Sequence, residues 1–78
     1  MSFDYAKLRG KIKEVYRTQD EFAKALGIGR VSLSQRLNNT LDFSQEEINT
    51  ACKILGLAAS DIPDYFFTPQ VQKSEQAR

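Results

Sequence analysis

The fold of this chain is decided by a stretch in its first half. Residues 18–39 read TQDEFAKALGIGRVSLSQRLNN. Two short runs with helical spacing flank Gly27-Ile28-Gly29, and the second run is rich in polar side chains. A chain of 78 residues has few apolar side chains to spare for a core, so a helix with so few of them requires an explanation.

The first run carries the signals that begin and end a helix. Thr18 and Glu21 have the spacing of a capping box, and Gly27 suits the left-handed backbone that commonly follows a last helical turn. Its apolar residues share one face: Phe22, Ala23 and Leu26. The sequence therefore predicts a short helix between Thr18 and Gly27, held in place by packing because it is too short to be stable alone.

The second run, Arg30 to Asn38, has a single pair of large inward residues, Leu33 and Leu37. At about 100° per residue, an inward Leu33 and Leu37 direct the opposite face of the helix outward. Four side chains are expected to look away from the core: Val31, Ser32, Ser34 and Gln35. Arg30 lies in the first turn, where a long side chain extends past the helix end.

Two helices joined by a glycine-containing turn are typical of a helix-turn-helix, whose second helix enters a DNA major groove. Ala23 allows the helices to approach closely, and Ile28 fills the crevice between them. Arginine can pair with guanine, glutamine with adenine, and serine with several base edges, while Val31 can contact a thymine methyl group. Gln19 and Asn38 are expected to lie toward flanking phosphates. The alternative is an ordinary helical connection with a solvated polar face.

The rest of the chain also has helical patterning. Helices are expected over Tyr5–Tyr16, with Val15 facing inward, and over Gln45–Leu55, which follows the capping box of Ser44 and Glu47. A short fifth helix follows a cap at Ser60 or Asp61 and carries Ile62, Tyr65 and Phe66. Leu41 and Phe43 are expected to tuck under the loop between helices. Cys52 is expected to pack as a small buried hydrophobe.

These elements predict an all-α chain, a compact bundle of four to five helices that contains a helix-turn-helix. Residues 1–67 form the predicted domain, and residues 68–78 form a polar C-terminal tail. Within that boundary region, residues 67–71 could instead pair as an edge strand with residues 2–4.

The charges are unevenly distributed along the chain. The net charge is +1, but residues 1–40 hold eight Lys/Arg against four Asp/Glu, or +4, and residues 41–78 hold three against six, or −3. This asymmetry indicates either a basic face for a polyanion or a chance scatter over a solvated surface.

The residue inventory excludes several kinds of chemistry. With no histidine and a single cysteine, the chain cannot form an internal disulfide, a Cys/His zinc site or a histidine-dependent nucleophile. We therefore expect no enzyme, no cofactor and no metal. No apolar run is long enough for a membrane span and no secretory leader is found, so a cytoplasmic location is expected.

Residues 18–39 resemble the helix-turn-helix of the lambda-repressor and Cro-like family, whose members commonly read T-Q-x-x-h-A-x-x-h-G-h before a polar helix. From SFDYAKLRGKIKEVY to DIPDYFFT, the chain further resembles small Cro-type regulators from the lysis-lysogeny regions of phages of low-GC Gram-positive bacteria. The resemblance implies a five-helix transcriptional regulator that binds a double-stranded operator. It assigns base reading to Arg30, Val31, Ser34 and Gln35, and DNA backbone contacts to Gln19, Ser32 and Asn38.

The sequence departs from that family at two positions. Gly29 stands where relatives often have a Ser or Thr cap, and Asn39-Thr40 replaces the usual Gly-Lys, which removes an expected phosphate contact. Both changes weaken the expected grip on DNA. The alternative hypothesis is a protein-interaction module that binds the phage repressor and modulates repression. A homodimer on a pseudo-palindromic site is also expected if the domain reads one half-site, with Tyr65, Phe66 and Phe67 as interface candidates unless they close the core.

Overall fold

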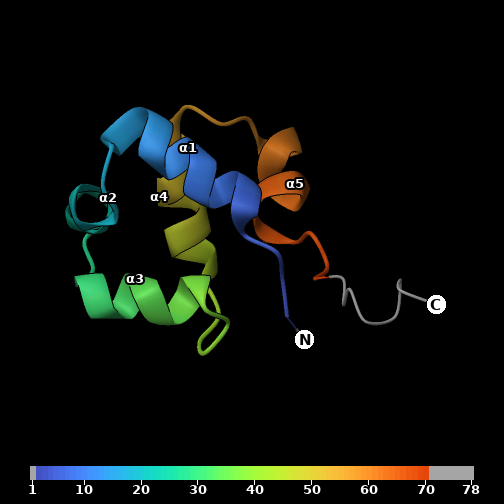
Figure 1. Ribbon diagram of the computed structural model, residues 1–78. Coiled ribbons are helices and arrows are strands. Elements are labelled where there is room, and N and C mark those ends of the chain that lie inside the picture. Colours follow the sequence, from blue (N-terminus) through green and yellow to red (C-terminus); the bar gives the residue numbers. More distant parts are fainter. Residues whose placement is uncertain (1, 71–78) are drawn as a thin grey trace.

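The computed structural model describes residues 2–70, which form five α-helices and one 3-10 helix (Figure 1). The elements are α1 (Ala6–Tyr16), α2 (Gln19–Leu26), α3 (Arg30–Leu37), α4 (Gln45–Leu55), the 3-10 helix (Ala59–Asp61) and α5 (Ile62–Phe66). The predicted all-α fold is confirmed. Among residues 2–70, none of the helices has both the length and the apolar character needed to span a bilayer.

The hinge between α2 and α3 has the predicted local structure. The Thr18 hydroxyl accepts a hydrogen bond from the Glu21 backbone N–H at 3.2 Å, which caps α2. Gly27 has a φ of +89°, and its N–H and that of Ile28 both donate to the Ala23 carbonyl oxygen. The chain thus changes direction, and Figure 1 shows α2 nearly end-on while α3 runs across the view.

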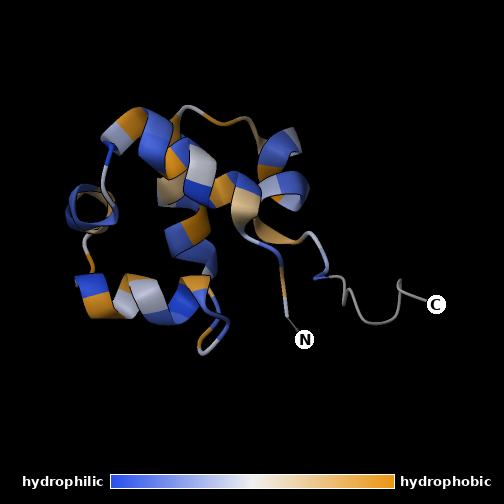
Figure 2. Ribbon diagram, viewed as in Figure 1, coloured by the Kyte–Doolittle hydropathy of each residue, from blue (hydrophilic) through white to orange (hydrophobic). Residues whose placement is uncertain are grey.

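The core gathers one face of every α-helix. Leu33 is fully buried and Leu37 is 3% exposed, so α3 is oriented as predicted. Ala23 and Cys52 are buried as well. The remaining core residues come from the segment before α1 and from the other helices: Tyr5, Leu8, Ile12, Phe22, Ile48, Ala51, Leu55 and Phe66. In Figure 2 the ribbon of α3 alternates between hydrophilic and hydrophobic residues.

Two predicted inward residues lie at the surface instead. Val15 is 44% exposed because Tyr16 fills the adjacent space, with its ring centroid 5.7 Å from that of Phe22. Leu41 is 47% exposed because Phe43 occupies the space under the loop, where it contacts the rings of Tyr5 and Phe66 edge-on. In both places the aromatic neighbour, which was also expected to face inward, packs against the core and the aliphatic residue does not.

The two ends of the described chain lie side by side. Phe3 and Pro69 form an antiparallel bridge, supported by hydrogen bonds from Asp4 N to Thr68 O at 2.7 Å and from Gln70 N to Ser2 O at 3.2 Å. The alternative pairing proposed from the sequence is therefore confirmed for residues 68–70, while residue 71 lies outside the described residues. The division into a domain of residues 1–67 and a tail stays a prediction.

Candidate recognition surface

The outer face of α3, which we define as Arg30, Val31, Ser34 and Gln35, lies at the surface to different degrees. Val31 is 70% exposed and Arg30 is exposed, whereas Ser34 and Gln35 are only partly exposed, as is Ser32 beside them. Gln35 is less open than its helical position suggests because the following loop turns back, and the N–H groups of Thr40 and Leu41 donate to its carbonyl oxygen. The most accessible part of the face is therefore the first turn of α3.

An ion pair attaches α3 to α4. Arg36 Nε lies 2.8 Å from Glu47 Oε1 and Arg36 Nη2 lies 3.1 Å from Oε2, while Nη1 donates to the Ser32 carbonyl oxygen. The two side chains are 17% and 18% exposed. The hydrogen bonds from Arg36 hold the pKa of Glu47 below its ordinary value, against the opposing effect of burial. Arg36 therefore has a structural partner on α4.

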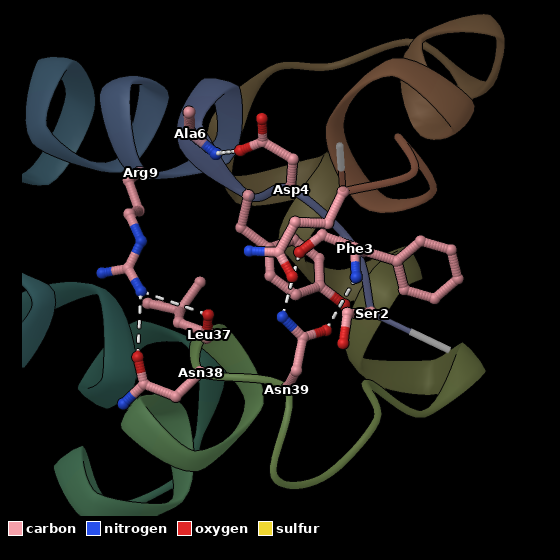
Figure 3. A pocket seen from close by; sticks show the side chains of 10 residues that line it. Ser2, Phe3, Asp4, Ala6, Arg9, Leu37, Asn38 and Asn39 are labelled. Carbon is pink, nitrogen blue, oxygen red and sulfur yellow. Dashed lines mark hydrogen bonds between the residues drawn. The ribbon is translucent and has the colours of Figure 1, made fainter. Parts of the chain in front are cut away.

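Polar side chains also secure the C-terminal end of α3 (Figure 3). Arg9 Nη2 donates to the Leu37 carbonyl oxygen at 3.1 Å and to Asn38 Oδ1 at 3.2 Å, and Asn38 Nδ2 donates to Ser34 Oγ at 3.3 Å. Both the oxygen and the nitrogen of the Asn38 side-chain amide are therefore hydrogen-bonded within the chain. Arg9 supplies a positive charge where the helix dipole favours one.

Asn39 connects the end of α3 to the N-terminal segment. Its backbone is left-handed, with a φ of +66°, which asparagine tolerates better than most residues. Its Oδ1 accepts from the Phe3 N–H at 2.9 Å and its Nδ2 donates to the Phe3 carbonyl oxygen at 3.0 Å, so one side chain pairs with Phe3 as a strand would (Figure 3). These contacts border a hollow of about 310 Å³ between the N-terminal segment and the end of α3.

Gln19 lies at the start of α2, beside a basic hollow. The hollow has a volume of about 200 Å³ and is lined by Arg9, Ile12, Lys13, Arg17 and Gln19. Gln19 and Asn38 are thus both placed near Arg9, on the side of the molecule where α1 approaches the α2–α3 pair. The roles on DNA given to Gln19, Ser32 and Asn38, and to the outer face of α3, stay predictions.

The fold and this surface define a class of small all-helical proteins in which a solvent-facing third helix is fixed by polar contacts at its end. Within that class, the chain belongs to the family described as "Protein of unknown function (DUF739)", whose model matches residues 1–69.

A solved structure is similar over almost the whole chain. It is the solution structure of the modulator of repression (MOR) of the temperate bacteriophage TP901-1 from Lactococcus lactis. The two sequences are 42% identical, the alignment covers 92% of this chain and 97% of that one, and the TM-score is 0.77. No curated protein matches the chain.

These comparisons correct the function predicted from the sequence. The main prediction, a Cro-like repressor that binds operator DNA in a sequence-specific manner, is wrong, because the similar structure is that of a modulator of repression. The finding favours the alternative hypothesis of a module that modulates a repressor. The sequence signals failed at this step because a helix-turn-helix geometry does not by itself identify the molecule that its second helix contacts. The homodimer stays a prediction.

Proposed function

We propose that this chain modulates repression in a temperate phage by binding the phage repressor protein. The observation that carries the proposal is the 42% identity with the modulator of repression over nearly the full length of both chains. The role is one of binding without catalysis, and it is carried out where the repressor works, in the cytoplasm of the bacterial host. Kinship with the lambda-repressor and Cro-like proteins is part of the proposal, and it is supported by the pattern of residues 18–39.

The outer face of α3 is the proposed contact with the repressor. Val31 is 70% exposed on the first turn, beside the exposed Arg30. Burying an exposed valine against a protein surface is favourable, and arginine is enriched in protein interfaces. A phosphate backbone would contact Arg30 but offers little apolar surface for Val31.

The engagement of nearby cations supports a protein partner. Arg36 is committed to Glu47, and Arg9 is committed to the end of α3 through Leu37 and Asn38. Nonspecific affinity for DNA depends on cations that neutralise phosphates, and the chain has a net charge of only +1. The helix that would have to approach a duplex is α3, which carries Arg30 and Arg36. Of these two arginines, only Arg36 has an acidic partner among the residues that the structure describes, so Arg30 is the one arginine of α3 left to contact phosphates.

The test measures binding to the repressor encoded by the same phage, by titration calorimetry, for the natural chain and two matched variants. Val31→Ser removes the exposed valine of α3, and Val15→Ser removes a valine that is 44% exposed on α1. We expect Val31→Ser to weaken binding about tenfold, or about 1.4 kcal/mol, and Val15→Ser to leave it unchanged. Melting temperatures of both variants control for folding.

A mobility shift on operator DNA complements the calorimetry. The shift of the repressor–DNA complex should change when the chain is added, while the chain alone should give no salt-sensitive shift. The proposal fails if the repressor and the chain do not bind one another. If Val31→Ser and Val15→Ser weaken repressor binding equally, the proposed function is retained but the outer face of α3 is not the interface.

A further inference from the structure

A third hollow lies away from the outer face of α3. It has a volume of about 310 Å³. It lies between the N-terminal half of α4 and α5, and it also includes one residue before α4 and one residue after α5. We call it the α4–α5 groove. Its lining residues are Phe43, Gln45, Ile48, Asn49, Ile62 and Phe67. None of them belongs to the outer face of α3, and Figure 1 shows α5 on the side of the molecule opposite α2.

The floor of the groove is built largely from aromatic and aliphatic side chains. Phe43 stands edge-on to Phe66, with ring centroids 5.4 Å apart, and Phe67 stands edge-on to Phe3 at 5.5 Å. Ile48 belongs to the core, while Phe67 remains 47% exposed. Aromatic side chains held in this way present apolar area at a low cost in conformational entropy, because their positions are already fixed.

The segment of the chain that forms the groove is acidic. Exposed carboxylates stand beside the lining residues in the sequence: Asp42 precedes Phe43, Glu46 follows Gln45, and Asp64 lies within α5. Residues 42–67 hold five acidic residues and a single cation, Lys53, for a net charge of −4. Even with Glu47 paired to Arg36, the segment around the groove is acidic. This potential disfavours nucleic acid and favours a positively charged protein segment.

We propose that the α4–α5 groove docks a basic amphipathic helix of a partner protein. An apolar groove between two helices suits the helix-in-groove mode, in which residues at i, i+3, i+4 and i+7 enter the groove. Basic residues along the edges of such a helix would be attracted by the net negative charge of residues 42–67. The inference goes beyond the proposed function, because the groove is separate from the surface assigned to the repressor.

A second copy of the chain does not fit this description. Its basic residues are concentrated in α1, α2 and α3, and the apolar faces of those helices are buried in the core. The buried residues include Leu8 and Ile12 of α1, Phe22 and Ala23 of α2, and Leu33 and Leu37 of α3. A folded copy therefore offers basic side chains without the apolar stripe that the groove would bury.

The experiment titrates the isotope-labelled full chain with a synthetic helical peptide of about 15 residues that carries leucine at i, i+3, i+4 and i+7 and lysine elsewhere. We expect saturable NMR shift changes centred on Phe43, Ile48, Ile62 and Phe67. A peptide with glutamate in place of lysine should not bind. Asp42→Lys should weaken binding about fivefold, whereas Glu14→Lys, the same charge change at an exposed site on α1, should not.

Phe67→Ala provides a second test of the groove, and its melting temperature reports whether the fold is intact. It should weaken peptide binding, while Val31→Ser should leave it unchanged, so failure here is distinguishable from failure of the repressor contact. The proposal is overturned if no saturable binding occurs, if the glutamate peptide binds equally well, or if the changes map to the outer face of α3. If the NMR signals of the groove residues shift with protein concentration in the absence of peptide, a second copy of the chain occupies the groove, and this result also overturns the proposal.

Discussion

The helices α3 and α4 solve the problem of helix stability in different ways. The longer helix, α4, buries Ile48, Ala51, Cys52 and Leu55 and begins with a complete capping box in which Ser44 and Glu47 exchange hydrogen bonds. The shorter helix, α3, buries only Leu33 and Leu37. It begins at Gly29, which provides no side-chain hydrogen bond to the first turn.

What α3 lacks in local stability it gains from polar contacts with its neighbours. Arg36 attaches it to α4, Arg9 binds its last carbonyl group, and Asn39 attaches the following residue to the N-terminal segment. These attachments lie at the sides and the C-terminal end of α3. The difference from α4 teaches that these attachments leave the side chains of Arg30 and Val31 uninvolved, and both are exposed at the first turn.

Leu33→Ala should have the largest effect, because Leu33 is fully buried and is one of only two core residues on α3. We expect a loss of about 2–5 kcal/mol in the free energy of unfolding, measured by chemical denaturation. Val31→Ala, two positions away on the same helix, should change it by less than about 0.5 kcal/mol. Similar losses for both variants would contradict the assigned orientation of α3.

Arg36→Ala should have the next largest effect, because it leaves the partly buried Glu47 without its cation. We expect a loss of about 1–3 kcal/mol in the free energy of unfolding near neutral pH. The loss should exceed that of Lys11→Ala, since the Lys11–Glu14 pair is longer, at 3.5 Å, and Glu14 is exposed.

The Arg36–Glu47 pair also predicts a pH dependence. The pKa of Glu47 is lower in the folded chain than the ordinary value of about 4.3, so the folded state binds the proton more weakly than the unfolded state. The stabilisation is therefore complete above that ordinary value and is lost as the pH falls through the lowered pKa. Denaturation at a series of acidic pH values should show a smaller decrease for Arg36→Ala than for the natural chain. An equal decrease would assign the acid sensitivity to other carboxylates.

The sequence was sufficient to predict the elements whose signals are local. Thr18, Gly27 and Ser44 mark helix ends through their own backbone and side-chain chemistry, and the spacing of Leu33 and Leu37 orients α3. The exposure of Val15 could not be predicted, because the extent of the covered face of α1 depends on the positions of the other helices.

The polar contacts of α3 and the binding partner of the chain likewise could not be predicted from local sequence patterns. Arg9 and Arg36 look like free cations in the sequence, and only the folded chain brings them to Asn38 and Glu47. The outer face of α3 was recognised as a surface, but its polar side chains suit base edges and protein groups alike. The repressor is proposed as its partner because of the similarity to the modulator of repression.

The smallest expected effects come from the N-terminal caps, because Ser44 caps α4 with its side chain and Gly29 cannot cap α3. Ser44→Ala removes the hydroxyl that accepts the Glu47 N–H at 3.1 Å and should lower the free energy of unfolding by about 1 kcal/mol. Gly29→Ser supplies α3 with the hydroxyl that it lacks, and should raise the free energy of unfolding by a few tenths of a kcal/mol. A Cβ at Gly29 would meet nothing within 4 Å, and its φ of −77° is open to any residue. Denaturation curves measure both changes. A loss of stability in Gly29→Ser would show that this turn needs glycine for a reason other than capping.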